Sequence, residues 1–312
     1  MFKQPRWTRL AAAILAVVLS SGPSRADEPT ASREQTLVVG RVSQDPVKTL
    51  PRLRAMAAYL ETRLASAGIT ASEVIVVRSN AEMVELLRSG AVDMVSETAM
   101  SAFQFVEKAD AEILLREWKR GVAEYESILI VGRNSGITMI EELRDHVIAF
   151  EDPGSTSGFL MPMALLSENG ICAVQLAAPG QRPPAGCVGY LFTNGEINIA
   201  AWVARGITDA GALNNLDWAD ESRTPPALQA ELDIFMASPR IPRSVVLVRG
   251  NTRPELRAAL RDTLIGMEAD ELAVEVLKIY YGVSRYDPFV GQTALDLAAV
   301  QRHYEAVRAR LQ

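Results

Sequence analysis

Three hydroxyl side chains stand in a row between two glycines in the stretch EDPGSTSGFLMP, residues 151–162. Ser155, Thr156 and Ser157 follow an apolar run and precede a segment with helical spacing, so they mark the start of a helix. A helix start leaves about four backbone N–H groups without intrahelical partners, and its dipole favours negative charge. Hydroxyl donors added there would complete a seat for an oxyanion. A plain helix cap in a solvated loop is the alternative interpretation.

Pro162 lies about five residues into this helix, near the limit that a first turn tolerates. We therefore expect either that the helix begins near Gly158 or that its start is distorted. An oxyanion seat made of amides and hydroxyls needs no lysine or arginine, so it suits an acidic protein.

Signatures of catalysis are missing from the sequence. It contains no G-x-G-x-x-G motif after a strand, no Walker loop and no H-E-x-x-H motif. GSTSG resembles the nucleophile elbow G-x-S-x-G but has threonine at the central position. The only histidines, His146 and His303, are far apart in sequence and far from the cysteines. The pattern favours binding over catalysis and predicts no metal site and no cofactor.

The first 26 residues have the organisation of a signal peptide. The basic segment KQPRWTR precedes the apolar run LAAAILAVVL (10–19), which is too short to span a bilayer. Ser24-Arg25-Ala26 then places small residues at the −3 and −1 positions of a signal-peptidase cleavage site. An N-terminal membrane anchor is the alternative. Removal of 1–26 takes away four of the 32 basic residues and none of the 38 acidic ones, which changes the net charge from −6 to −10. Such a surface argues against nucleic acid or anionic lipid as a partner.

The two cysteines, Cys172 and Cys187, flank the loop-rich sequence AVQLAAPGQRPPAG. An exported chain matures in an oxidising compartment, so we expect a disulfide between them. Two buried free thiols are the alternative.

Strands and helices alternate along the chain. Strands are predicted at 36–41, 73–79, 91–96, 125–136, 146–152 and twice within 232–250. Helices are predicted at 50–68, 80–90, 137–145, 157–169 and through most of the chain after 254, and the stretch 196–213 predicts a helix, a turn and a strand. This alternation predicts an α/β fold with two lobes, each a mainly parallel sheet flanked by helices. We expect residues 27–131 and 233–312 to form lobe 1, with 132–232 inserted as lobe 2.

The chain resembles the periplasmic phosphate/phosphite/phosphonate-binding proteins of ABC importers. The matching segments are DPGSTSGFLMP (152–162), YESILIV (125–131), SPRIP (238–242) and VVGRVSQDP (38–46). The resemblance implies two lobes that close on a ligand around a hinge, as in type II periplasmic binding proteins. It implies a periplasmic monomer that gives a small oxyanion to a permease. It also implies that Ser155, Thr156 and Ser157 hold the oxyanion and that the Tyr125 hydroxyl assists.

Two positions depart from the family pattern. Glu97 stands where an aromatic residue is expected, and Glu196 stands where a histidine is expected. If both face the cleft, they repel a phosphate dianion by roughly 1–4 kcal/mol per charge pair at 4 Å. The ligand could then carry a cationic group, a glutamate could be protonated, or the carboxylates could bind a metal or a cation. Two rival functions remain: an exported enzyme that uses Glu97 and Glu196 as an acid–base pair, and a binding module for a sensor kinase.

Overall fold

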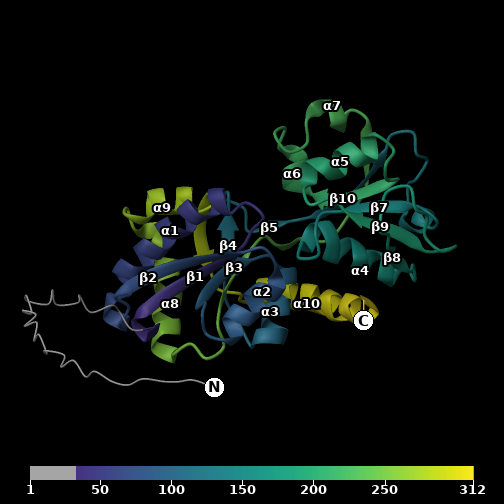
Figure 1. The fold of residues 1–312 in the computed structure, drawn as a ribbon. Helices are drawn as coiled ribbons and strands as arrows, with labels where there is room; N and C mark the ends of the chain where they lie inside the picture. Colours follow the sequence, from purple (N-terminus) through teal and green to yellow (C-terminus); the bar gives the residue numbers. More distant parts are fainter. Residues whose placement is uncertain (1–32, 312) are drawn as a thin grey trace, which may run out of the picture.

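The computed structural model describes residues 33–311, arranged as two α/β halves joined by a narrow connection (Figure 1). The predicted signal peptide, residues 1–26, lies outside the described residues. Within 33–311, no helix combines the length and the apolar character that crossing a membrane requires.

The first half contains a six-stranded sheet with the strand order β14-β4-β13-β3-β1-β2. Its strands are β1 (Thr36–Val42), β2 (Ala71–Val77), β3 (Met94–Glu97), β4 (Glu112–Lys119), β13 (Val245–Val248) and β14 (Val283–Asp287). Strand β1 runs parallel to β2 and β3, whereas β13, β4 and β14 extend the sheet with antiparallel pairings. β4 and β14 are strands that the sequence analysis did not predict.

Helices cover both faces of this sheet. The helices are α1 (Pro46–Arg63), α2 (Asn80–Arg88), α3 (Ala99–Ala109), α8 (Pro254–Gly266) and α9 (Ala273–Ile279). One apolar core joins α1, α8 and α9 to the sheet, and a second joins α2 and α3 to its other face. Helix α1 begins earlier than the predicted residue 50, because Asp45 accepts a hydrogen bond from the Lys48 N–H and Pro46 suits a first helical position.

The second half contains another six-stranded sheet, in the order β11-β6-β10-β7-β9-β8. Its strands are β6 (Ser127–Gly132), β7 (Val147–Phe150), β8 (Ala173–Gln175), β9 (Val188–Phe192), β10 (Ala210–Asn214) and β11 (Leu232–Ala237). β10, β7, β9 and β8 are parallel, and β6 and β11 are antiparallel to their neighbours. The main helices are α4 (Met161–Glu168) and α5 (Glu196–Ala204), with the short α6 (Asn215–Ala219) and α7 (Pro226–Gln229) nearby.

The helix predicted at 137–145 is only the short turn η3 (Ile140–Leu143). The Glu142 carboxylate accepts hydrogen bonds from the N–H groups of Thr138 and Met139 and caps the turn at its start. Asp145 then adopts a φ of 68°, which a continuing helix does not allow.

The chain passes between the halves at a two-stranded ribbon of β5 (Glu124–Tyr125) and β12 (Ile241–Pro242). By sheet membership the second half runs from Ser127 to Ala237, so β6 and β11 flank the inserted segment 132–232 expected from the sequence. The last helix, α10 (Gln292–Leu311), packs against both α3 and α4 and so bridges the two halves (Figure 1). The predicted class, two α/β lobes with a connecting hinge, is confirmed, with three of five strand pairings parallel in the second sheet and two of five in the first.

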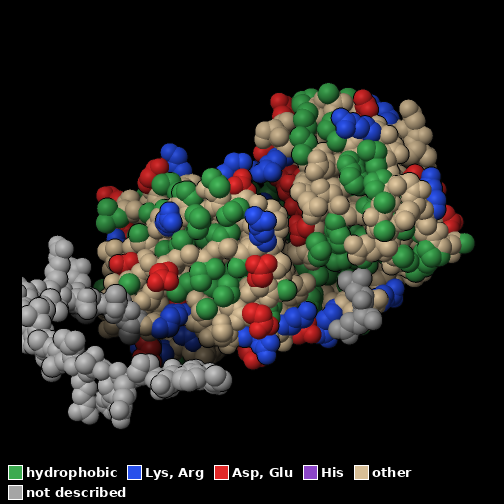
Figure 2. All heavy atoms as spheres, viewed as in Figure 1, with side chains coloured by type: hydrophobic (Ala, Val, Ile, Leu, Met, Phe, Trp, Pro, Cys, Tyr) green, Lys and Arg blue, Asp and Glu red, His purple; other side chains and the backbone are tan. Residues whose placement is uncertain are grey.

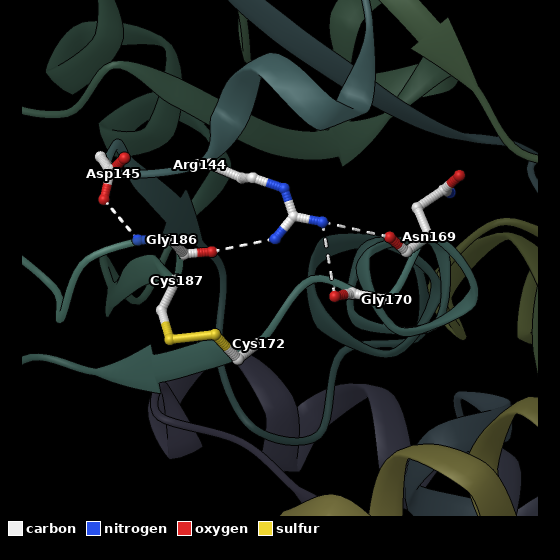
Figure 3. The surroundings of a disulfide bond; sticks show 7 residues. All are labelled: Arg144, Asp145, Asn169, Gly170, Cys172, Gly186 and Cys187. Atoms are coloured by element: carbon white, nitrogen blue, oxygen red, sulfur yellow. Dashed lines mark hydrogen bonds between the residues drawn. A yellow bond between two sulfur atoms is a disulfide. The ribbon is translucent and has the colours of Figure 1, made fainter.

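Cys172 and Cys187 form a disulfide that joins the starts of β8 and β9. Figure 3 shows how Arg144 supports this region by donating to the carbonyl of Gly186 at 3.0 Å and to those of Asn169 and Gly170 at 3.4 Å. The Gly186 N–H donates in turn to Asp145. The disulfide therefore joins the segment between α4 and the edge strand β8 to the loop that precedes β9.

Candidate functional site

A cleft of about 630 Å³ lies between the two halves. Five of its walls are segments that each follow a strand and precede a helix: 42–45, 78–80, 97–98, 151–155 and 194–196. Carboxyl ends of parallel strands are the usual place for ligands in α/β proteins. Ser101, Gln104 and Arg223 complete the lining.

This arrangement turns five helix N-termini toward the cleft, those of α1, α2, α3, α5 and the π-helical turn η4 (Thr156–Leu160) that precedes α4. Each N-terminus carries about half a positive elementary charge, or about 2.5 in total. The cleft therefore has a positive potential from the backbone that does not require basic side chains.

Pro162 explains the π-helical turn. It has no N–H to donate to the carbonyl of Gly158, and its ring would crowd that carbonyl in a regular helix. The Met161 N–H reaches back to the Thr156 carbonyl instead, and the Gly158 carbonyl accepts from the Glu151 N–H at 3.1 Å. Of the two outcomes expected for Pro162, the structure has a distorted helix start.

The hydroxyl run is buried, with Ser155 at 5%, Thr156 at 0% and Ser157 at 3% exposure. Of the three, only Ser155 lines the cleft. Its hydroxyl donates to Oε2 of Glu151 at 2.7 Å and accepts from the Gly158 N–H at 2.9 Å. Ser155 thus caps the helix and binds a carboxylate of the protein itself.

Thr156 and Ser157 contribute to contacts between elements. The Thr156 hydroxyl accepts from the Met100 N–H at 2.9 Å, which connects the second half to α3 of the first. The Ser157 carbonyl accepts from the Ser127 hydroxyl at 2.6 Å. Thr98 also donates across the halves, to the Gly154 carbonyl at 2.7 Å. The segment with the hydroxyl run is therefore one surface on which the halves meet.

Tyr125 is 2% exposed, at the hinge in β5, and does not line the cleft. The guanidinium of Arg243 lies 4.8 Å from the centre of its ring. Burial raises the pKa of the Tyr125 hydroxyl, opposed by the charge of Arg243 and by the hydroxyls of Ser157 and Thr156. The structure thus places Tyr125 beside Thr156 and Ser157, beneath the cleft.

Glu97 and Glu196 both line the cleft, from opposite halves. Glu97 ends β3, where it accepts from the Val42 N–H at 3.1 Å and pairs with Arg41 at 3.6 Å. Glu196 opens α5 and lies 3.6 Å from the guanidinium of Arg223. Burial, followed by the charge of Asp217, raises the pKa of Glu196.

Two further carboxyl groups were missed by the sequence analysis. Glu151 and Asp152 directly follow β7, separated by two residues from the hydroxyl run, and both line the cleft. Burial, together with repulsion from Glu196 and Asp152, raises the pKa of Glu151 well above 4.5. The sequence did offer a signal for them, because Glu151-Asp152 stands at the carboxyl end of the predicted strand 146–152.

Carboxylates outnumber cations in the cleft. Asp45, Glu97, Glu151, Asp152 and Glu196 face two guanidinium groups, those of Arg78 and Arg223. Figure 2 shows acidic side chains inside the groove between the halves. Among residues 33–311, no group of three or more His, Cys, Asp or Glu side chains is arranged to hold a metal ion. The excess of carboxylates therefore offsets the positive ends of the five helices.

Comparison with known proteins gives a consistent family. The family model described as "ABC transporter, phosphonate, periplasmic substrate-binding protein" matches residues 42–293. The Phosphonates-binding periplasmic protein of Escherichia coli (strain K12) is 27% identical over 203 residues, 62% of this chain and 56% of that protein. The match thus spans little more than half of that relative's length.

Solved structures are similar over nearly their whole length. XAC2383 from Xanthomonas citri bound to chloride ion has a TM-score of 0.85 and 31% identity, covering 88% of this chain and 99% of that chain. The same protein bound to ATP has a TM-score of 0.85 and 30% identity, covering 89% and 100%. PhnD1 from Prochlorococcus marinus (MIT 9301), in complex with methylphosphonate, shares the fold with a TM-score of 0.64 and 18% identity, covering 88% and 99%.

Proposed function

Because the chain belongs to the phosphonate family of periplasmic substrate-binding proteins of ABC transporters, we propose that it captures a small solute with both a phosphorus oxyanion and a protonated amine. The solute would bind in the cleft between the halves and pass to an ABC permease in the inner membrane. We further propose that the exported protein acts in the periplasm as a monomer and carries out no reaction on its ligand.

The five helix N-termini that face the cleft support the proposal that the ligand carries an oxyanion. Backbone N–H groups at such ends bind anions without a basic side chain. Among similar proteins, XAC2383 is bound to chloride in one structure and to ATP in another, which supports anion capture by this chain as well.

One observation carries the proposal that the ligand has an amine. Glu151 and Glu196 lie together on one wall of the cleft. The charge of Glu196 is among the causes that raise the pKa of Glu151, so the two carboxyl groups are close enough to interact. Arg223 is the one cation that forms an ion pair with either of them among residues 33–311. A protonated amine placed between them would replace their repulsion by two attractions.

A phosphate or alkylphosphonate dianion fits the same wall poorly. Each of the two carboxyl groups repels such a dianion by roughly 1–4 kcal/mol per charge pair at 4 Å when it is ionised. Because 1.4 kcal/mol corresponds to about a tenfold change in affinity, even a repulsion of about 1 kcal/mol would lower the affinity measurably. A zwitterionic ligand avoids this repulsion because its amine faces the carboxyl groups, while its oxyanion still contacts the helix N-termini.

A thermal-shift screen of the mature protein tests the proposal. The panel contains phosphate, phosphite, ethylphosphonate, 2-aminoethylphosphonate, glycine and arginine. We expect 2-aminoethylphosphonate to raise the melting temperature most, because it alone in the panel pairs an amine with a phosphonate. A hit that is chemically converted during incubation would contradict a role restricted to binding and would favour the rival enzyme.

The charge-matched control is Glu255→Gln, which removes one carboxylate from the exposed surface of α8. Glu151→Gln and Glu196→Gln should each reduce the shift from 2-aminoethylphosphonate, while Glu255→Gln should not. Equal shifts in all three variants would show that Glu151 and Glu196 do not contact the amine.

A further inference from the structure

A second charged region lies at the hinge, outside the lining of the cleft. Arg41 is near the end of β1, Lys119 ends β4, and Arg243 directly follows β12. The Arg41 guanidinium lies 4.7 Å and the Lys119 ammonium 4.8 Å from the centre of the Tyr281 ring. Three basic groups from distant parts of the sequence thus gather around the hinge, and Figure 2 shows basic side chains where the two halves meet.

These cations have few anionic partners. Within residues 33–311, no carboxylate lies within 4.0 Å of Lys119 or Arg243, and Arg41 pairs only with Glu97, at 3.6 Å. Glu117 also faces Lys119, but its Oε2 accepts from the Ser96 hydroxyl at 2.7 Å. Three basic groups therefore face two carboxyl groups, those of Glu97 and Glu117, in a chain with a net charge of −6.

The crowding has an electrostatic consequence at Lys119. Burial, together with the charge of Arg41 and, more weakly, Arg243, lowers its pKa from 10.5 to about 7, against the opposing charges of Glu117 and Glu97. Lys119 and Arg243 are nevertheless only partly buried, so both keep some contact with solvent. An anion among these groups would relieve their mutual repulsion.

The backbone also holds the cluster in place. Tyr281 has a φ of 58°, an uncommon value for a bulky residue. Its ring contacts Arg52 as well, at 4.9 Å. Strained backbone of this kind persists where surrounding contacts require it, and it is concentrated at functional sites.

From this geometry we infer that Arg41, Lys119 and Arg243 form an anion-binding subsite at the hinge, which takes a compact tetrahedral oxyanion such as phosphate or sulfate. Arg41 contacts Glu97, and Glu97 lines the cleft, so the subsite adjoins the cleft. Lys119 ends β4, which leads into the β5–β12 ribbon, and Arg243 lies between β12 and β13, where the chain leaves it. A bound anion therefore ties the two strands that connect the halves.

Isothermal titration with sulfate and with inorganic phosphate at pH 8 tests the subsite. Lys119→Met and Arg243→Met should each weaken binding about tenfold or more, the effect typical of losing a hydrogen bond to a charged group. The matched control is Lys108→Met, which removes the same charge from the exposed end of α3 and should change affinity less than about twofold.

A second measurement is the number of protons taken up when the anion binds. At pH 8 Lys119 is largely neutral, because its pKa is about 7. A bound anion favours the charged form, so binding should take up protons, seen as heats that vary with the ionisation enthalpy of the buffer. Lys119→Arg should keep the affinity and lose the proton uptake, because arginine stays charged.

Three results would overturn the inference. They are no sulfate or phosphate binding by the wild type, equal affinity in Lys119→Met and Lys108→Met, and binding without proton uptake. Sulfate and phosphate have no amine, so this test does not depend on the role of Glu151 and Glu196. A failure of the aminophosphonate proposal would leave these outcomes unchanged.

Discussion

Glu151 accepts a hydrogen bond from the Ser155 hydroxyl across 2.7 Å. The first hydroxyl of the Ser-Thr-Ser run is therefore already bound to a carboxyl group of the protein itself. An incoming oxyanion must either displace this carboxylate or bind beside it. A protonated amine on the ligand would be attracted to the Glu151 carboxylate and would favour binding beside it.

Gly158 is required for this relationship. A Cβ at position 158 would lie 2.7 Å from the Cβ of Glu151, too close for either atom to remain in place. We predict that Gly158→Ala lowers the free energy of unfolding by about 1–3 kcal/mol, a typical result of overpacking. Urea denaturation followed by circular dichroism measures this change.

Gly266→Ala is the matched control, because a Cβ there meets no atom within 4 Å. It lies in the last turn of α8, where alanine is the better helix former. Equal stability of Gly158→Ala and the wild type would show that Glu151 does not pack against Gly158 in solution.

The raised pKa of Glu151 predicts a pH dependence of stability. A carboxyl group whose pKa is higher in the folded state holds more protons there than in the unfolded chain. Stability conferred by this proton is present at low pH and is lost as pH rises from about 4.5 through the folded pKa.

Melting temperatures of the wild type and of Glu151→Gln should therefore diverge as the pH increases. We expect Glu151→Gln to be the more stable protein at neutral pH, because the amide keeps a neutral side chain next to Glu196 and Asp152. Parallel curves between pH 4 and 8 would argue that Glu151 titrates as an ordinary exposed carboxylate.

The sequence predicted the elements whose signals are local. The spacing of Leu53, Met56 and Leu60 predicted the buried face of α1, although the start of this helix at Asp45 and Pro46 was missed. Strand β4 was missed because its sequence, EILLREWK, mixes charged and apolar residues. Its partners are β13 and β14, from much later in the chain, so tertiary pairing decides its conformation.

The candidate site shows the same division. Ser155 was found because it stands at the start of a predicted helix, and Glu196 because it occupies a position where the resembling family has a histidine. Glu151 was close to the motif, but its hydrogen bond with Ser155 is a tertiary contact that no spacing in the sequence indicates. Lys119 and Arg243 come together only through the hinge ribbon, and no spacing in the sequence indicates that they are neighbours.

The disulfide should stabilise the second half without affecting the cleft directly. It closes a loop with a separation of 15 residues, for which the chain-entropy model gives about 3 kcal/mol. We predict that Cys172→Ala/Cys187→Ala lowers the free energy of unfolding by about this amount, and that reduction of the wild type with dithiothreitol has the same effect. Ligand affinity at 25 °C should stay within about twofold, since neither cysteine lines the cleft. A large loss of affinity in the folded variant would connect this edge of the sheet to the site.

Calorimetric titration with two ligands that differ only in the amine tests the central claim most directly. We predict that the wild type binds 2-aminoethylphosphonate at least about tenfold more tightly than ethylphosphonate, because one charge-assisted contact is worth about 1.5–3 kcal/mol. Glu196→Gln should remove most of this preference by weakening the amine ligand, and Glu255→Gln should preserve it. Tighter binding of ethylphosphonate, or a preference unchanged in Glu196→Gln, would contradict the account.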